Sequence, residues 1–161
     1  MLYLFEWNIK IVINGIMKQE KHKIFMDICR RIGWKCTPQR LAVYDYLCGN
    51  RQHPNVDRVW HDIQKTIPSI TRESVYRILN ELSQHGVICR LDHIESARYD
   101  SRTQPHGHFI CTKCGAISDF DLPEGVSLPA VDLPGDVHHV EFRAVGICAT
   151  CLNEAPRKTP E

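Results

Sequence analysis

Apolar residues recur at helical spacing through the first half of the chain. Residues 23–32 carry isoleucines four residues apart, at Ile24, Ile28 and Ile32, and this spacing places them on one face of a helix. Thr37-Pro38 is typical of a helix start, because threonine caps the end and proline fits the first turn. We therefore predict one helix over 23–32 and a second that begins at Pro38 and ends before Gly49.

Two further helices are predicted in the same half. Pro54 opens a segment with apolar residues at helical spacing, and Pro68 ends it; these residues are Val56, Val59, Trp60 and Ile63. The pattern is sharpest over residues 71–85, where Thr71 or Ser69 can cap the helix and Gly86 ends it. Its apolar residues follow the i, i+3, i+4, i+7 rule and are expected to face the core. They are Val75, Ile78, Leu79 and Leu82.

The polar face of the 71–85 helix and the segments that follow it indicate DNA binding. Residues 87–92 and 96–100 have strand-like character with a short polar turn between them, so helices and hairpin together predict a winged helix. The polar face mixes cations for phosphates with planar groups that can reach base edges in the major groove. Its residues are Arg72, Tyr76, Arg77 and Asn80. A merely solvated face is the alternative for this helix taken alone.

Composition is that of an ordinary globular protein. The 161 residues are 43% apolar and 24% charged, which excludes a fibrous or largely disordered chain, and no run of 18 apolar residues could form a membrane-spanning helix. Residues 1–17 are apolar but interrupted by polar and charged residues, unlike a signal peptide. We interpret them as an N-terminal extension, or as the product of an upstream start codon with Met17 or Met26 as the true start, and we expect a cytoplasmic protein.

Charge divides the chain in two, although the net charge is only +1. Residues 17–92 hold 13 lysines and arginines against 8 acidic residues, whereas residues 93–161 hold 6 against 10. A basic half beside an acidic half rich in cysteine and histidine favours nucleic-acid contact by the first and cation binding by the second.

Four of the eight cysteines form two C-x-x-C pairs, Cys111/Cys114 and Cys148/Cys151. Each pair places two thiolates on one tight turn, and two such pairs make the closed site of a structural zinc ion, with no open position for catalysis. The 33 residues between the pairs exceed the usual zinc-ribbon spacing. A small sheet must therefore bring the pairs together, and its candidate strands are residues 108–111, 116–120 and 139–148.

A second group of metal-binding residue types surrounds the first cysteine pair: Asp100, His106, His108 and Asp119. The two histidines are two residues apart on a predicted strand, so both imidazoles project to one face. Imidazole and carboxylate ligands together suit Fe(II), Mn(II) or Zn(II), and we expect this ion to exchange more readily than the thiolate-bound zinc. His53, far upstream, is a candidate fifth ligand that would connect the two halves.

These motifs resemble those of the ferric uptake regulator (Fur) family of bacterial metal-dependent repressors. The match covers roughly residues 24–152, and it rests on GWKCTPQRLAVYDYL (33–47), HPNVDRVW (53–60), SVYRILNELSQHGVI (74–88), HGHFICTKCG (106–115) and GICATC (146–151). The spacing from Asp100 to Asp119 is similar to that of the peroxide-sensing (PerR-like) branch, in which aspartates complete the regulatory site. The resemblance implies that Fe(II) in this site reacts with peroxide, that a ligand histidine, His53 or His106, is oxidised, and that DNA is released. The implied regulatory ligands are His53, Asp100, His106, His108 and Asp119.

The chain departs from the family pattern in three places. Pro105 and Gly107 stand where iron and zinc sensors often have further ligands, so we expect no second sensory site. Residues 122–134 contain Pro123, Pro129 and Pro134 where the family usually has a dimerisation helix. Since an interior proline costs about 3 kcal/mol or more, that helix is expected to be shortened or lost. Cys89 lies near a ligand position of the zinc sensors. It can be interpreted as a ligand of a zinc-sensing protein or as a buried thiol of the wing.

We therefore predict an α+β protein with a winged helix-turn-helix DNA-binding domain over 18–101 and a small α/β dimerisation domain over 102–161, which holds the four-cysteine zinc site. The resemblance implies a homodimeric repressor that binds pseudo-palindromic double-stranded operator DNA under the control of Fe(II) or Mn(II), with Zn(II) as the alternative ion. The 71–85 helix would enter the major groove, and Lys35 and Arg40 would contact phosphate or the minor groove. An iron- or zinc-uptake regulator of the same family is the alternative function.

A metalloenzyme is the rival class. His93-Ile94-Glu95 precedes the first cysteine pair, as a His-x-Glu does in zinc deaminases, but Ile110 replaces the proline of their P-C-x-x-C motif. The sequence also has no H-E-x-x-H motif and no nucleophile elbow. A zinc-ribbon interaction module would explain the cysteines but not the basic half, so we expect a regulator and not an enzyme.

Overall fold

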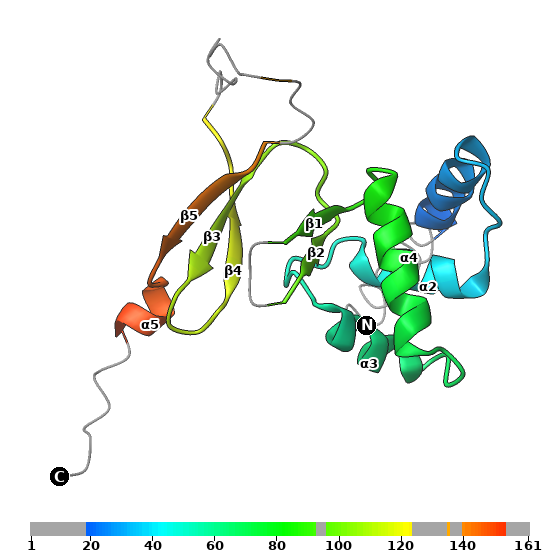
Figure 1. Cartoon of the computed structure of the whole chain (residues 1–161), viewed down its shortest axis with the longest axis horizontal. Helices are drawn as coiled ribbons and strands as arrows, with labels where there is room; N and C mark the ends of the chain where they lie inside the picture. The colour runs from blue at the N-terminus through cyan, green and yellow to red at the C-terminus, as the bar shows by residue number, and fades with distance from the viewer. Residues whose placement is uncertain (1–18, 93–95, 124–134, 136–139, 154–161) are drawn as a thin grey trace, which may run out of the picture. The chain divides into compact units, whose positions relative to one another are not determined.

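The protein is described by a computed structural model over residues 19–92, 96–123, 135 and 140–153 (Figure 1). These residues form two compact units, and the chain passes from the first to the second between Thr103 and Gln104. The expectations for residues 1–17, for Pro129 and Pro134, and for His93-Ile94-Glu95 lie outside the described residues. Within the described ranges, no helix combines the length and the apolarity needed to cross a membrane.

The first described helix covers residues 19–31, which include most of the predicted range 23–32. Phe25 and Cys29 are buried, whereas Ile24 is 45% exposed and Ile28 is only half-buried. The face that carries the isoleucines is therefore not the buried face of this helix. The i, i+4 pair one position further along faces the core instead, because the Phe25 ring stacks on Tyr44 with ring centroids 4.6 Å apart.

Three further helices follow, and each begins at a polar cap. Helix α2 (Pro38–Leu47) is capped by Thr37, α3 (Val56–Gln64) by Asn55, and α4 (Arg72–Gln84) by Thr71. In each case the side-chain oxygen of the cap accepts a bond from a backbone N–H three residues on, which satisfies a group that the helix leaves unpaired. The predicted starts at Pro38 and after Thr71 are confirmed.

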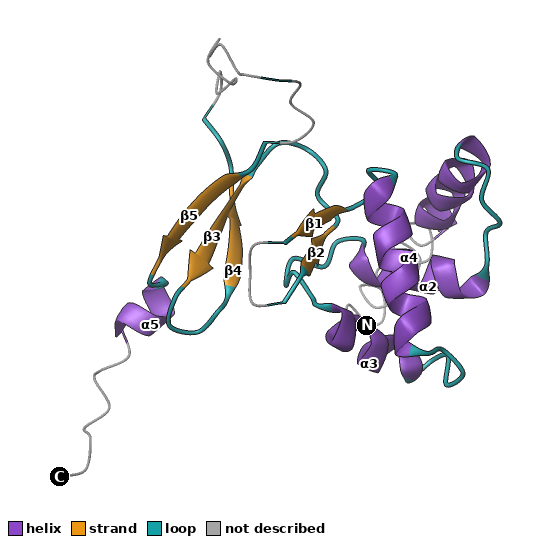
Figure 2. Ribbon diagram, viewed as in Figure 1, coloured by secondary structure: helices purple, strands orange, loops and turns teal. Residues whose placement is uncertain are grey.

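The core of the first unit is built from the apolar faces of these helices. The predicted inner residues of α4 are all buried, as are Val56, Val59 and Ile63 of α3. Strands β1 (Cys89–Leu91) and β2 (Arg98–Asp100) pair antiparallel after α4, with Arg90 opposite Tyr99 (Figure 2). Helices followed by this hairpin are the predicted winged helix.

The second unit is a three-stranded sheet followed by a short helix. Strand β3 (Gly107–Cys111) lies in the centre, with β4 (Ile117–Phe120) antiparallel on one side and β5 (Phe142–Gly146) parallel on the other. Helix α5 (Ala149–Asn153) follows β5 directly. The three strands that the sequence predicted are present, and their arrangement positions the candidate metal ligands.

Candidate metal centres and nucleic-acid interface

The parallel pairing of β3 and β5 brings the two cysteine pairs together. Its register sets Cys111 opposite Gly146, so the first pair follows the end of β3 and the second pair follows the adjacent end of β5. Gly115 closes the first turn at a φ of +70°, and its N–H donates to the Cys111 carbonyl at 2.9 Å. The left-handed backbone that glycine allows therefore folds the first pair into a tight loop.

The four sulfur atoms have the spacing of a tetrahedral thiolate site. All four lie within 4.8 Å of one another, and Cys114 Sγ is 3.8 Å from Cys148 Sγ. A tetrahedron with metal–sulfur distances of about 2.3 Å has edges of about 3.8 Å. The donor set therefore fits a structural zinc ion.

Backbone hydrogen bonds lower the pKa of one thiol of this group, whereas burial raises the pKa of another. The Cys148 N–H donates to Cys111 Sγ at 3.3 Å, and backbone hydrogen bonds of this kind lower the pKa of Cys111 to about 6. Burial raises the pKa of Cys151 to about 12. A bound cation is what holds such a buried sulfur as the thiolate at neutral pH, because metal binding displaces the proton.

In the first unit, His53 and Asp100 form a buried pair. His53 lies before α3 with a positive φ of 47°, which is uncommon outside glycine, and Asp100 ends β2. The Tyr99 N–H donates to the Pro54 carbonyl at 3.1 Å and so holds β2 against the His53 loop. His53 Nε2 is 4.0 Å from Asp100 Oδ2, and their side chains are 1% and 3% exposed.

In the second unit, His106, His108 and Asp119 lie together where β3 begins. His108 pairs across the sheet with Asp119, and the Nε2 atoms of the two histidines are 2.9 Å apart. Asp119 Oδ1 is 3.8 Å from each of these nitrogens. The two imidazoles meet as predicted, but His106 lies one residue before β3 and only His108 is on the strand.

The tautomer of His106 suits a metal ligand. Its Nδ1 is 2.8 Å from the Gln104 carbonyl, and a carbonyl only accepts, so Nδ1 carries the hydrogen and Nε2 keeps its lone pair. Imidazole nitrogens and a carboxylate oxygen together are a donor set that Fe(II), Mn(II) or Zn(II) can accept.

The structure explains why position 107 is a glycine, which the sequence did not reveal. It pairs with Phe120 across β3 and β4, and a Cβ at this position would collide with the Phe120 ring. A further ligand side chain at this position would have to displace the Phe120 ring.

The predicted DNA-contacting residues of helix α4 differ in their exposure and in their ion pairs. Tyr76 is 43% exposed, and the Arg77 side chain is 62% exposed while it contacts Glu81 at 3.3 Å. Arg72 bonds Asp57 through Nε at 2.5 Å, with both side chains largely exposed. Exposed pairs of this kind contribute little to stability, so the arginines can exchange their carboxylates for phosphates.

Asn80 and Tyr76 belong to a network with a residue that sequence reasoning missed. Arg90 of β1 donates to Asn80 Oδ1 at 2.8 Å. The hydrogen bond to Asn80 and the charge of Arg90 lower the pKa of Tyr76. Arg90 therefore orients the polar face of α4 from the wing. This role depends on the position of β1 relative to α4, which the sequence pattern does not give.

Arg40 differs from the other predicted contacts because its guanidinium is bound within the unit. It donates to Glu81 Oε2 of α4 at 2.7 Å and to the Lys35 carbonyl at 3.1 Å, and it lies 4.5 Å from the Trp34 ring centroid. Its side chain is only 16% exposed. This geometry favours a role in holding α4 in place, whereas Lys35 is exposed and accessible to a phosphate.

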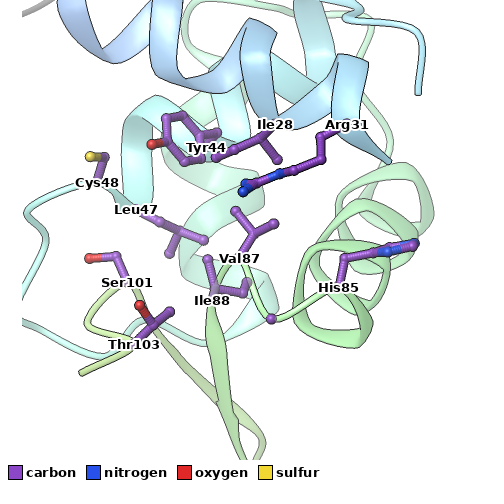
Figure 3. Close-up of a pocket in the computed structure, with 11 residues that line it drawn as sticks. Ile28, Arg31, Tyr44, Leu47, Cys48, His85, Val87, Ile88, Ser101 and Thr103 are labelled. Atoms are coloured by element: carbon purple, nitrogen blue, oxygen red, sulfur yellow. The ribbon is translucent and has the colours of Figure 1, made fainter. Parts of the chain in front are cut away.

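A cavity of about 310 Å³ lies in the first unit between the 19–31 helix, α2 and the start of the wing (Figure 3). Figure 3 shows Arg31 reaching over Val87 and Leu47, with Ser101 and Thr103 on the wing side. None of the residues predicted to bind metal or DNA is among the described residues that line it. The cavity therefore stands apart from both candidate sites.

Sequence comparison places these features in a known family. A model of the ferric uptake regulator family matches residues 31–128. The peroxide-responsive repressor PerR of Staphylococcus epidermidis is 32% identical over 131 residues, which cover 78% of this chain and 86% of that protein. The protein of the same name from Staphylococcus aureus strain USA300 is 31% identical, with 78% and 87% covered.

Solved structures share the fold. The Helicobacter pylori ferric uptake regulator Fur superposes with a TM-score of 0.66 at 23% identity, over 84% of this chain and 93% of that chain. The Campylobacter jejuni peroxide stress regulator superposes with a TM-score of 0.58 at 28% identity, over 78% and 98%.

Proposed function

The chain belongs to the ferric uptake regulator family, and from this premise we propose that it is a metal-dependent transcriptional repressor that responds to peroxide. The single observation that carries the peroxide response is the aspartate at both carboxylate positions of the candidate regulatory group, Asp100 and Asp119. It agrees with the names of the curated relatives, which are peroxide-responsive repressors. Members of this family act as regulators, so the role we propose is not enzymatic.

The DNA-binding surface that we propose is the polar face of α4. Tyr76 and Arg77 are exposed there, and Asn80 is held by Arg90. Arg72 and Lys35 add positive charge that can neutralise phosphates. A repressor acts where the genome lies, so we also propose a cytoplasmic location.

The regulatory ligands that we propose are His53, Asp100, His106, His108 and Asp119. Within the first unit His53 and Asp100 are buried and 4.0 Å apart, and within the second unit His106 lies 3.8 Å from Asp119 and 2.9 Å from His108. An ion bound by residues of both units would restrict how the units move, and it controls DNA affinity only through its preference for the arrangement that fits DNA. Fe(II) in this site would supply the one-electron chemistry by which peroxide oxidises a ligand histidine.

The partner that we propose is a second copy of the chain, bound so that two α4 helices read the two halves of a pseudo-palindromic operator. Strand β5 is an edge strand of the described sheet. Val145 of β5 is 61% exposed, and Leu152 of α5 is 67% exposed. Exposed apolar side chains on an edge strand and on the helix that follows it are typical of a surface that is covered in an assembly.

The test compares metals under peroxide. Zinc-loaded protein is given Fe(II) or Mn(II), bound to a duplex that the protein itself selects from a random-sequence library, and then treated with hydrogen peroxide. We expect release from DNA with Fe(II) but not with Mn(II), and oxygen added to His53 or His106 in the released protein. Release only when the metal is chelated would contradict the peroxide response and support an iron- or zinc-uptake regulator.

The zinc-uptake alternative rests on Cys89. Its sulfur donates to the Arg102 carbonyl at 3.5 Å, and burial raises the pKa of the thiol. Both features describe a protonated thiol packed in the wing. The test measures how strongly added Zn(II) increases DNA affinity. If Cys89→Ser reduced this increase, the zinc-sensing alternative would replace the peroxide response.

A further inference from the structure

Three helices end around the cavity of about 310 Å³ in the first unit (Figure 3). The 19–31 helix contributes Ile28 and Arg31, α2 contributes its last residue, Leu47, and α4 contributes Gly86, which follows its cap. The segments just before β1 and just after β2 complete the lining. Neither the proposed DNA-binding surface nor the proposed regulatory ligands include a lining residue, so the proposed function leaves the cavity unexplained.

The floor of the cavity is apolar. Leu47 and Ile88 are 1% and 2% exposed, and Val87 packs against the same hydrophobic core. Figure 3 shows these three side chains together next to the Arg31 side chain. Water against such a floor makes few hydrogen bonds, so an apolar group that displaces this water gains free energy.

The charge at the mouth of the cavity favours an anion. Arg31 is exposed and reaches over the apolar floor (Figure 3). Among the described residues that line the cavity, none carries a carboxylate. The neighbouring Arg30, by contrast, is paired with Asp27 at 2.8 Å. The guanidinium of Arg31 is therefore placed to pair with an acid that comes from outside the protein.

The helix ends oppose this preference only weakly. Carbonyl groups at the end of a helix carry a partial negative charge of about half an elementary charge in total. At α2, Lys21 Nζ donates to the Cys48 carbonyl at 3.0 Å and offsets this charge. At α4, the Val87 N–H donates to the Leu82 carbonyl at 2.9 Å. The full charge of Arg31 therefore dominates at the mouth.

We propose that this cavity binds a small organic anion, a carboxylate with an apolar tail. The carboxylate would pair with the Arg31 guanidinium, which offers two parallel N–H donors, and the tail would lie on the apolar floor. Since a water molecule occupies about 30 Å³, the cavity has room for about ten non-hydrogen atoms, which corresponds to a tail of about eight carbons with its carboxylate. Octanoate has this size and is the probe.

The position of the cavity connects such a ligand to DNA binding, and this step rests on the proposed function. The lining joins the end of α4 to α2 and to the wing, and Ser101 in the lining directly follows Asp100, a proposed ligand of the regulatory ion. A molecule in the cavity would restrain the end of α4 relative to the wing. It changes DNA affinity to the extent that it fits the DNA-bound arrangement better or worse than the free one.

The first experiment is calorimetry with the full chain, loaded with zinc at the four-cysteine site and given no second metal, so that no regulatory ion can take up the carboxylate. Octanoate is compared with octanamide, which lacks the charge, and with butyrate, which lacks most of the tail. We expect one octanoate per chain and affinities for the other two that are at least about tenfold lower. Equal binding of octanamide, or several octanoates per chain, would overturn the proposal.

Two neighbouring arginines give a matched pair of variants. Arg31→Gln should weaken octanoate binding by about tenfold and leave octanamide binding unchanged. Arg30→Gln removes the same charge from the same helix, but its exposed ion pair lies outside the lining, so octanoate affinity should change by less than about twofold. An equal loss in both variants would indicate attraction by net charge alone and would overturn the site.

Two further measurements locate the bound molecule. Ile28→Phe places a larger ring in the lining and should abolish binding of octanoate and octanamide alike, with helical circular dichroism unchanged. Amide chemical shifts of the wild type do not depend on how this variant folds. Octanoate should shift the amides of Leu47, Val87 and Ser101, whereas shifts confined to β5 and α5 would place the molecule on the exposed apolar surface of the second unit and overturn the proposal.

A last readout tests the link to DNA. With Mn(II) bound, saturating octanoate should change the affinity for the selected duplex by about fivefold or more, and the duplex should change octanoate affinity by the same factor. Arg31→Gln should abolish the effect of octanoate at the same concentration. Octanoate binding with unchanged duplex affinity would overturn the link. If metal-dependent DNA binding itself failed, calorimetry would still report on the cavity, so the two failures are distinguishable.

Discussion

The absence of a side chain at Gly107 leaves room for the Phe120 ring beside the two histidines. The Phe120 ring covers the glycine on the strand that also carries Asp119. The glycine, the ring and the metal-binding residue types are therefore parts of one arrangement.

We predict that Gly107→Ala pushes the Phe120 ring away and weakens binding of the regulatory ion. Overpacking of this kind costs about 1–3 kcal/mol, and the lower end applies because Phe120 is 38% exposed and can move. Mn(II) affinity measured by calorimetry should fall by about fivefold. The double variant with Phe120→Ala removes the collision and should recover most of the loss; an unchanged affinity in Gly107→Ala would contradict the account.

Arg40 supports α4, so we predict that Arg40→Ala lowers the free energy of unfolding by about 1–2 kcal/mol. Its removal leaves the half-buried Glu81 carboxylate without its closest donor. Urea denaturation of the zinc-loaded protein measures the change. Arg30→Ala is the control, because Arg30 and Asp27 are 75% and 56% exposed, and it should change stability by less than about 0.5 kcal/mol. Equal effects of the two variants would remove Arg40 from its supporting role.

Sequence patterns identified residues whose role depends on neighbours in the chain. They missed roles that depend on contacts with residues far away in the sequence. Thr37 was predicted as a cap because the reason lies within three residues of the chain. The bond between Arg40 and Glu81 was not predicted, because the two residues are 41 positions apart. The spacing of apolar residues in the 19–31 helix allows more than one buried face, and the packing of Phe25 on Tyr44 selects one.

At the scale of elements, α4 combines a fully apolar inner face with a polar outer face. The inner face contributes to the stability of the unit, and the outer face is the proposed DNA-binding surface. Val75, Ile78, Leu79 and Leu82 are buried, whereas Tyr76 and Arg77 are exposed. A substitution on the outer face can therefore change DNA binding without loss of the fold.

We predict that Arg77→Ala weakens binding to the selected duplex by about 1–3 kcal/mol if Arg77 reads a base, with unfolding unchanged within about 0.5 kcal/mol. Fluorescence anisotropy at fixed salt measures the affinity. Arg58→Ala, on the exposed face of α3, is the control for charge removal. An unchanged affinity in Arg77→Ala would exclude Arg77 from the interface.

Most elements were predictable because their patterns are periodic and their ends carry caps or glycines. The strands of the second unit were predicted, but the parallel pairing of β3 with β5 was not, since strand order depends on contacts between segments more than 30 residues apart. That pairing is what brings Cys111 near Cys148. The sequence therefore predicted the four-cysteine group and the need for a sheet, but not the register that joins the pairs.

At the scale of the whole molecule, the two units are stabilised in different ways. Among the described residues, the hydrophobic core cluster extends from Phe25 to Tyr99 and includes no residue of the second unit. The buried apolar side chains described in the second unit are Cys111 and Cys151, both of the zinc cluster. The second unit therefore depends on its metal, and the first unit on burial.

We predict that removal of zinc with a chelator under reducing conditions unfolds the second unit and leaves the first unit folded. Structural zinc contributes about 10–16 kcal/mol of apparent binding free energy, most of it folding energy. Helical circular dichroism should largely persist, while amide protection is lost in β3, β4 and β5. Cys114→Ser should reproduce this state. Retention of protection in β3 after zinc removal would contradict a structural role for the ion.

The central claim is that an exchangeable ion at the histidine and aspartate group controls DNA affinity. The most direct measurement is the affinity of zinc-loaded protein for its selected duplex with and without Mn(II), in the wild type and in Asp119→Asn and His108→Ala. The account predicts that Mn(II) tightens binding by about 5- to 150-fold in the wild type and has little effect in either variant. Equal affinity with and without the ion in the wild type would contradict it.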